Sequence, residues 1–122
     1  MKRCMIVDDS SVVRKVAKRI LASHAVLVTE AATGTEALSL CSREMPDLIV
    51  VDTTLPDMAA ADLIRELLSY PAVVKPTILI CIAEVDVGAI MRAKRAGASG
   101  YLLKPFNRPQ LLERFREFAV AA

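Results

Sequence analysis

The sequence predicts an α/β domain in which a five-stranded parallel sheet carries helices on both faces. The first observation is that short apolar runs rich in Val, Ile and Leu alternate with amphipathic segments along all 122 residues. The second is that five segments of each kind occur, with no internal repeat and no linker-like stretch between them. Strands that alternate with helices pair in parallel through right-handed crossovers, which places helices on both faces of a doubly wound sheet.

The five expected strands are short, nearly continuous apolar runs, as is typical of strands that are buried on both faces. In chain order they are Cys4–Val7, Ala25–Thr29, Leu48–Val51, Thr77–Ile82 and Gly100–Leu103. The third run leads directly into an aspartate, Asp52. Folding alone does not explain why a buried strand should end on a charged residue.

The five expected helices are marked by apolar residues three and four positions apart. The sets are Val12, Val13, Val16 and Ile20; Ala37, Leu38, Cys41 and Met45; Leu63, Ile64, Leu67 and Leu68; Val87, Ile90 and Met91; and Leu111, Leu112, Phe115 and Phe118. The first helix is expected to begin at Ser10 or Ser11, and the fourth at Asp86. Thr33 with Glu36 three residues later predicts a capping box at the start of the second helix.

The composition predicts one globular domain, residues 1–122, because 54% of the residues are hydrophobic and 25% are charged. The net charge of +2 does not indicate nucleic-acid binding, and no segment is left over for a recognition helix. The three cysteines are odd in number and lie among apolar neighbours, which favours reduced core thiols. With no signal peptide or membrane-spanning run, we expect a cytoplasmic protein that does not insert into membranes.

Polar residues follow three of the expected strands and should meet at one edge of the sheet. Asp8 and Asp9 follow the first strand, Asp52 the third and Lys104 the fifth, and ligands of such sheets bind at the carboxyl ends of the strands. Two carboxylates about 6 Å apart repel by about 3 kcal/mol at an effective dielectric near 20, so this cluster needs cations. Oxygen ligands without His or Cys favour Mg²⁺, or Mn²⁺, over zinc.

A carboxylate, a divalent cation and a lysine together indicate phosphoryl-transfer chemistry. The carboxylate can act as the nucleophile, while the two cations neutralise charge on the transferred group.

Four motifs then identify a family: "IVDDSSVVRKVAKRIL", "ATGTEAL", "MPDLIVVDTTLPDM" and "AKRAGASGYLLKPF". With their spacing they resemble the receiver domain of two-component response regulators, in particular the stand-alone, chemotaxis-type kind. The resemblance extends over essentially the whole chain. It implies a flavodoxin-like fold with strand order 2-1-3-4-5, and a phosphoacceptor rather than an enzyme that acts on a separate substrate.

The resemblance also implies the roles of the residues at this edge. Asp52 would accept a phosphoryl group from a histidine kinase or a histidine phosphotransfer protein, and Lys104 would contact that group. Asp9, Asp52 and the backbone carbonyl of Thr54 would bind Mg²⁺, with Asp8 assisting through water. The Lys104–Pro105 bond is expected to be cis. An unidentified output protein would bind the face formed by the fourth helix, the fifth strand and the fifth helix.

Two positions depart from the family pattern. The family carries a Ser or Thr at the end of the fourth strand, which moves with an aromatic residue on the fifth. Tyr101 supplies the aromatic, but Ile82 replaces the hydroxyl. Losing a hydrogen bond to a charged group can weaken the coupling between phosphorylation and the active conformation about 10- to 100-fold. The alternative is therefore a pseudo-receiver or phosphate sink with weakened switching. Ala60 also replaces a usual glycine in the loop after the third strand.

Other motifs have competing interpretations. "ATGTEA" resembles a phosphate-binding loop of flavin-binding proteins, but it follows the second strand rather than the first. "DTTLPD" resembles the aspartate-nucleophile phosphatases, which need a second acid where this chain has Thr54. The basic run on the first helix (Arg14, Lys15, Lys18 and Arg19) is either a solvated face or a docking surface for the phosphoryl donor.

Overall fold

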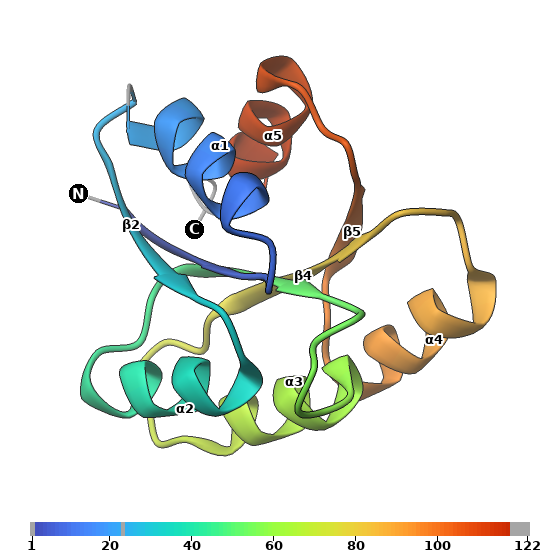
Figure 1. Cartoon of the computed structure of the whole chain (residues 1–122). Helices are drawn as coiled ribbons and strands as arrows, with labels where there is room; N and C mark the ends of the chain where they lie inside the picture. The colour runs from blue at the N-terminus through green and yellow to red at the C-terminus, as the bar shows by residue number, and fades with distance from the viewer. Residues whose placement is uncertain (1, 23, 118–122) are drawn as a thin grey trace.

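A computed structural model of the chain describes residues 2–22 and 24–117, and it confirms a parallel five-stranded sheet in the order β2-β1-β3-β4-β5. In chain order the elements are β1 (Lys2–Val7), α1 (Ser11–Ala22), β2 (Val26–Ala31), α2 (Gly34–Arg43), β3 (Leu48–Asp52), α3 (Ala60–Ser69), β4 (Thr77–Ile82), α4 (Val87–Ala96), β5 (Gly100–Leu103) and α5 (Arg108–Phe115). Figure 1 shows α1 and α5 on one face of the sheet and α2, α3 and α4 on the other.

The sheet divides the apolar interior into two layers. Met5 and Val7 of β1 belong to the cluster under α2, α3 and α4, whereas Cys4 and Ile6 belong to the cluster under α1 and α5. Every residue of β3, the central strand, is buried. This burial on both faces explains why the strands are continuous apolar runs in the sequence.

Two of the five strands have the predicted bounds, namely β4 and β5. β1 begins two residues earlier than expected, because Lys2 and Arg3 still pair with β2. β2 is displaced toward the C-terminus: Ala25 has a φ of 59° and belongs to the turn, and the strand continues to Ala31. Hydropathy alone does not separate the turn before β2 from the strand, and it does not show that polar residues at a strand end still belong to the strand.

Three predicted helix starts are correct. The hydroxyl of Ser10 accepts a hydrogen bond from the Val13 N–H at 3.3 Å, and the Asp86 carboxylate accepts one from the Ala89 N–H at 3.1 Å. Thr33 caps α2 by accepting from the Glu36 N–H at 3.0 Å.

The capping box predicted for α2 is only half formed, because the Glu36 carboxylate accepts from the N–H of Ala32 at 2.7 Å rather than from that of Thr33. A complete capping box lies instead at α5, between Asn107 and Gln110, where the sequence analysis did not identify one.

The apolar faces of α1 and α4 differ from the prediction. Val12 and Val16 were expected in the core but are 70% and 40% exposed, and Val87 and Met91 on α4 are 65% and 50% exposed. Ile20 on α1 is buried as predicted, but its buried neighbours are Ala17 and Leu21, and the buried residues of α4 are Ala93 and Ala96. The buried stripe of each helix includes alanines, Ala17 on α1 and Ala93 and Ala96 on α4, which the predicted apolar sets did not contain.

The other helices match their predicted faces more closely. α3 buries Leu63, Ile64 and Leu67, and α5 buries Leu111 and Phe115. Met45 lies beyond the end of α2 rather than on it, and Phe118 lies outside the described residues. All three cysteines are free and buried, as predicted. Among the described residues, no helix has the length and apolar character needed to cross a bilayer.

Candidate functional site

The polar residues predicted at the carboxyl edge of the sheet lie together there. Asp8 follows β1, where its N–H donates to the carbonyl of Ala31 at 3.0 Å. Asp52 ends β3 in register with Cys81 of β4. Lys104 follows β5, and its N–H donates to the carbonyl of Ile82 at 2.9 Å. The peptide bond between Lys104 and Pro105 is cis, as the resemblance implied.

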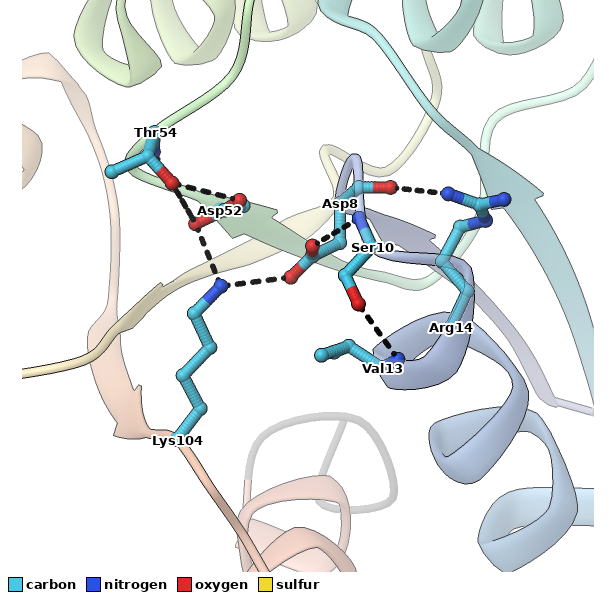
Figure 2. Close-up of polar contacts among 7 residues, drawn as sticks. All are labelled: Asp8, Ser10, Val13, Arg14, Asp52, Thr54 and Lys104. Atoms are coloured by element: carbon cyan, nitrogen blue, oxygen red, sulfur yellow. Dashed lines mark hydrogen bonds and ion pairs between the residues drawn. The ribbon is translucent and has the colours of Figure 1, made fainter.

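Lys104 joins two of the carboxylates. Figure 2 shows its ammonium group between them, 3.1 Å from Oδ2 of Asp8 and 3.0 Å from Oδ1 of Asp52. The side chains of Asp8 and Asp52 are 2% and 0% exposed, and that of Lys104 is 20% exposed. Burying two carboxylates is costly unless they are paired and hydrogen-bonded, so this lysine makes the cluster tolerable.

The charge of the cluster is still unbalanced. Asp8, Asp9 and Asp52 each offer a carboxylate oxygen, and these oxygens lie within 4.8 Å of one another. With all three ionised, three negative charges and the one positive charge of Lys104 leave a net charge of −2. An all-oxygen donor set with that charge fits a hard divalent cation such as Mg²⁺.

The electrostatics of the cluster extend to two titratable neighbours. Burial alone lowers the pKa of Lys104, but hydrogen bonds and charge from Asp52 and Asp8 outweigh it, and the pKa is raised overall. Burial raises the pKa of the Cys81 thiol to about 12, although the positive charge of Lys104 acts in the opposite direction. At neutral pH, Lys104 is therefore a fixed cation and Cys81 is a neutral thiol.

Asp8 is positioned by the start of α1. Its Oδ1 accepts a hydrogen bond from the Ser10 N–H at 2.9 Å, and its carbonyl accepts one from Arg14 Nη1 at 2.7 Å (Figure 2). Arg14 also pairs with Glu30 at 3.1 Å, and Lys15 and Lys18 lie 3.8 Å from the same carboxylate. The basic run of α1 is thus partly neutralised by β2.

Thr54 contacts the Asp52 carboxylate in a way that the sequence analysis missed, because it considered only the backbone carbonyl of this residue. The Thr54 hydroxyl lies 3.1 Å from both Oδ1 and Oδ2 of Asp52, and the Thr54 N–H donates to Oδ1 at 3.2 Å. A threonine two residues after an aspartate is a signal for such local contacts, because both side chains readily bond nearby backbone and polar groups.

Ile82 and Tyr101 lie on the same side of the sheet. Ile82 is 3% exposed and belongs to the cluster under α2, α3 and α4, and Tyr101 is a partly buried residue packed against that cluster. The guanidinium of Arg114 on α5 lies 5.9 Å from the centre of the Tyr101 ring, within the range of a cation–π contact. The position expected to carry a hydroxyl is therefore occupied by a core side chain.

The loop after β3 is held to the start of α2 by Asp57, another contact that the sequence analysis missed. The Asp57 carboxylate accepts hydrogen bonds from the Gly34 N–H, the Thr35 N–H and the Thr35 hydroxyl at 2.9, 2.9 and 2.7 Å. These bonds, those of Thr35 foremost, lower the pKa of Asp57. Next to it, Met58 packs so closely on Gly34 that a Cβ there would lie 2.6 Å from the methionine side chain.

Comparisons with known proteins agree with this geometry. The profile of the response regulator receiver domain matches residues 4–116. Chemotaxis protein CheY of Thermotoga maritima is 32% identical over 113 residues, which is 92% of each chain. Chemotaxis protein CheY of Pseudomonas aeruginosa is 32% identical over 116 residues, 94% of each chain.

A solved structure is similarly close. Chemotaxis response regulator CheY4 of Vibrio cholerae superposes with a TM-score of 0.91 at 28% identity, covering 97% of this chain and 98% of that one. Taken together, the strand order, the acidic edge with its lysine, and these similarities along nearly the whole chain lead to one conclusion. This protein belongs to the response regulator receiver domain family, in its CheY-like, chemotaxis-type form.

Proposed function

We propose that this chain is the phosphoacceptor of a two-component phosphorelay, in which Asp52 receives a phosphoryl group from a phosphohistidine and partner binding changes as a result. The single observation that carries the proposal is the Asp52 carboxylate, which is buried yet 3.0 Å from the ammonium group of Lys104 at the edge where the acidic cluster lies. The chain acts here as an acceptor that is itself modified, not as an enzyme with a separate substrate.

In the proposed step, an oxygen of the Asp52 carboxylate forms a bond to phosphorus while the P–N bond to the donor imidazole breaks. The electron pair of that bond stays on the imidazole nitrogen, and the product is an acyl phosphate. Lys104 pairs with Oδ1 of Asp52. Within residues 2–22 and 24–117, Oδ2 has no ion pair, and it is the oxygen that we assign as nucleophile. The lysine ammonium then neutralises charge on the transferred group.

Asp8, Asp9 and Asp52, together with the backbone carbonyl of Thr54, are the residues that we propose hold Mg²⁺ or Mn²⁺. When bound, the cation neutralises charge on the equatorial oxygens of the phosphoryl group. The net −2 charge of the acidic edge supports this assignment.

Phosphorylation can be tested with a small phosphoryl donor. Protein treated with phosphoramidate or acetyl phosphate plus Mg²⁺ should gain the mass of one phosphoryl group, and Asp52→Asn should gain none. Asp62→Asn is a matched control, since Asp62 is an exposed carboxylate on α3 paired with Arg65. An unlabelled parent protein, under conditions that label other receiver domains, would contradict the proposal.

The partners that we propose follow from two exposed surfaces. The phosphoryl donor is a histidine kinase or a histidine phosphotransfer protein, which we place at α1 beside the acidic edge, where Val12 and Val16 are exposed. An output protein binds the face formed by α4, β5 and α5, where Val87, Met91 and Leu103 are exposed. We propose no nucleic-acid partner for either surface.

A phosphate sink or pseudo-receiver is the second candidate, and the burial of Ile82 among apolar side chains favours it. The comparison of Ile82→Thr with Ile82→Val separates the candidates, because the two substituted side chains have the same shape and differ only in the hydroxyl.

The readout is the environment of Tyr101 before and after phosphorylation. The chain has two tyrosines and no tryptophan, so Tyr70→Phe leaves Tyr101 as the only tyrosine fluorophore. A phosphorylation response present in Ile82→Thr but absent in the parent and in Ile82→Val supports the sink. A full response in the parent supports the switch.

A further inference from the structure

The Thr54 hydroxyl contacts the Asp52 carboxylate directly, and this contact is separate from the metal-binding role proposed for the Thr54 backbone carbonyl. It lies 3.1 Å from both oxygens of the Asp52 carboxylate, and Figure 2 shows it on the side of Asp52 away from Asp8. Of the two carboxylate oxygens, Oδ1 also receives Lys104 and the Thr54 N–H, at 3.0 and 3.2 Å. Among the described residues, the Thr54 hydroxyl is therefore the donor within hydrogen-bonding distance of Oδ2, the oxygen assigned as nucleophile.

The length of these two contacts matters for the reaction. Hydrogen bonds from a hydroxyl to an ionised oxygen are usually 2.5–2.7 Å long. The contacts of 3.1 Å to both oxygens are therefore longer and weaker than usual. A donor accelerates a reaction only if its bond is stronger in the transition state than in the ground state. A hydroxyl held loosely beside the nucleophilic oxygen meets this condition, because it can form a shorter bond to an oxygen of the incoming phosphoryl group.

A second observation concerns the strand next to Asp52. Ile82 ends β4 and is buried among apolar side chains, so no hydroxyl is available at that position. The N–H of Thr53 donates to the carbonyl of Cys81 at 3.3 Å, which holds the start of the loop against β4. Thr54, one residue further along, is thereby fixed at the edge of the site.

We infer that the Thr54 hydroxyl donates to the phosphoryl group transferred to Asp52, and that it replaces the hydroxyl missing at Ile82. The inference rests on the proposed function. The Oδ2–P bond forms as the P–N bond of the donor breaks, the electron pair stays on nitrogen, and the hydroxyl proton remains on Thr54 throughout.

The test is a double-mutant cycle of Thr54→Val and Ile82→Thr, with the rate of phosphorylation by phosphoramidate and Mg²⁺ as the readout. Valine retains the shape of threonine and removes only the hydroxyl, and the backbone bond from residue 54 to Asp52 is unaffected. We expect Thr54→Val to slow labelling about tenfold. This is the lower end of the range for a hydrogen bond to a charged group, because Thr54 is exposed.

In the Ile82→Thr background, the same substitution should slow labelling less than threefold, because a second hydroxyl now serves the phosphoryl group. Ile82→Val is the control for the change of shape at this position. In the Ile82→Val background, Thr54→Val should again slow labelling about tenfold. A merely structural role for Thr54 predicts equal losses in all three backgrounds. Thr53→Val, which removes the neighbouring hydroxyl, should label at the parent rate.

An independent readout needs neither metal nor donor. The ¹³C resonance of the Asp52 carboxyl group in the metal-free protein should shift in Thr54→Val and stay in place in Thr53→Val. A labelled parent with an unaffected Thr54→Val, or equal losses in every background, would overturn this inference alone. A parent that takes no label would contradict the proposed function and this inference with it.

Discussion

Repulsion between the carboxylates of the acidic cluster should destabilise the metal-free protein, and replacing Asp9 with asparagine should reduce that repulsion. Asp9 is the exposed member of the cluster, and its carboxylate oxygen lies within 4.8 Å of those of Asp8 and Asp52. Asp9→Asn keeps the shape of the side chain and removes one negative charge. The charge of the cluster then changes from −2 to −1, counting Lys104 as +1.

The expected magnitude follows from the separations. Two unit charges 4.8 Å apart repel by about 3.5 kcal/mol at an effective dielectric of 20, and Asp9 has two such neighbours. Attraction to Lys104 and screening by water at this exposed position offset most of that sum. We expect Asp9→Asn to raise the free energy of unfolding by about 1–3 kcal/mol, which corresponds to a Tm increase of about 3–10 °C in a domain of this size.

Thermal unfolding in EDTA and in Mg²⁺ measures both consequences. A cation bound only by the folded state stabilises it by about 2.7 kcal/mol at 100 times its Kd, so the parent should gain stability in Mg²⁺ while Asp9→Asn gains little. Asp62→Asn is the matched control and should leave both the Tm and the Mg²⁺ response close to those of the parent. A lower Tm for Asp9→Asn in EDTA, or an undiminished Mg²⁺ response, would refute the reasoning.

Three further predictions concern other charges and thiols. Lys104→Met should lower the free energy of unfolding by about 3–5 kcal/mol in EDTA, because two buried carboxylates lose their cation. Urea unfolding measures this change, and an unchanged urea midpoint would contradict the prediction. Burial raises the pKa of both Cys4 and Cys81 to about 12, so the native state retains protons that the unfolded state releases near pH 9. Stability should therefore fall as the pH rises from about 9 toward 12, and native thiols should resist alkylation at pH 8; rapid labelling without unfolding would count against it. Hydrogen bonds, those from Thr35 first, lower the pKa of Asp57. This carboxylate therefore contributes stability above its unfolded pKa that is lost as the pH falls through its folded pKa, and Asp57→Asn should flatten the acid limb of a stability–pH curve; identical acid limbs would show that the contacts with α2 contribute nothing.

Much of the fold was predictable because its determinants are local. The period of the apolar residues distinguishes strands from helices, and β4 and β5 have the bounds expected from their apolar runs. The periodicity identified only Ile20 of the buried face of α1, where Val12 and Val16 form an exposed apolar stripe and Ala17 and Leu21 lie on the buried one. Which stripe is buried depends on how the helix packs against the sheet, and that is a property of the tertiary structure.

The chemistry at the sheet edge was also predictable, since parallel strands bring their carboxyl ends together wherever their sequences place Asp8, Asp52 and Lys104. The distances of 3.0 and 3.1 Å from one ammonium group to two carboxylates depend on the register of β1, β3, β4 and β5. The Asp57 contacts with α2 likewise join segments 22 and 23 residues apart.

The sequence by itself determined the order of the elements, the parallel sheet and the residue types at its carboxyl edge, because each depends on neighbouring residues and on where a strand ends. Only the tertiary structure decided that the Thr54 hydroxyl rests against both oxygens of Asp52 and that Ile82 is enclosed by apolar side chains. The physical reason is that side-chain contacts depend on the path of a loop and on packing between strands, and neither is encoded in the spacing of residues along the chain.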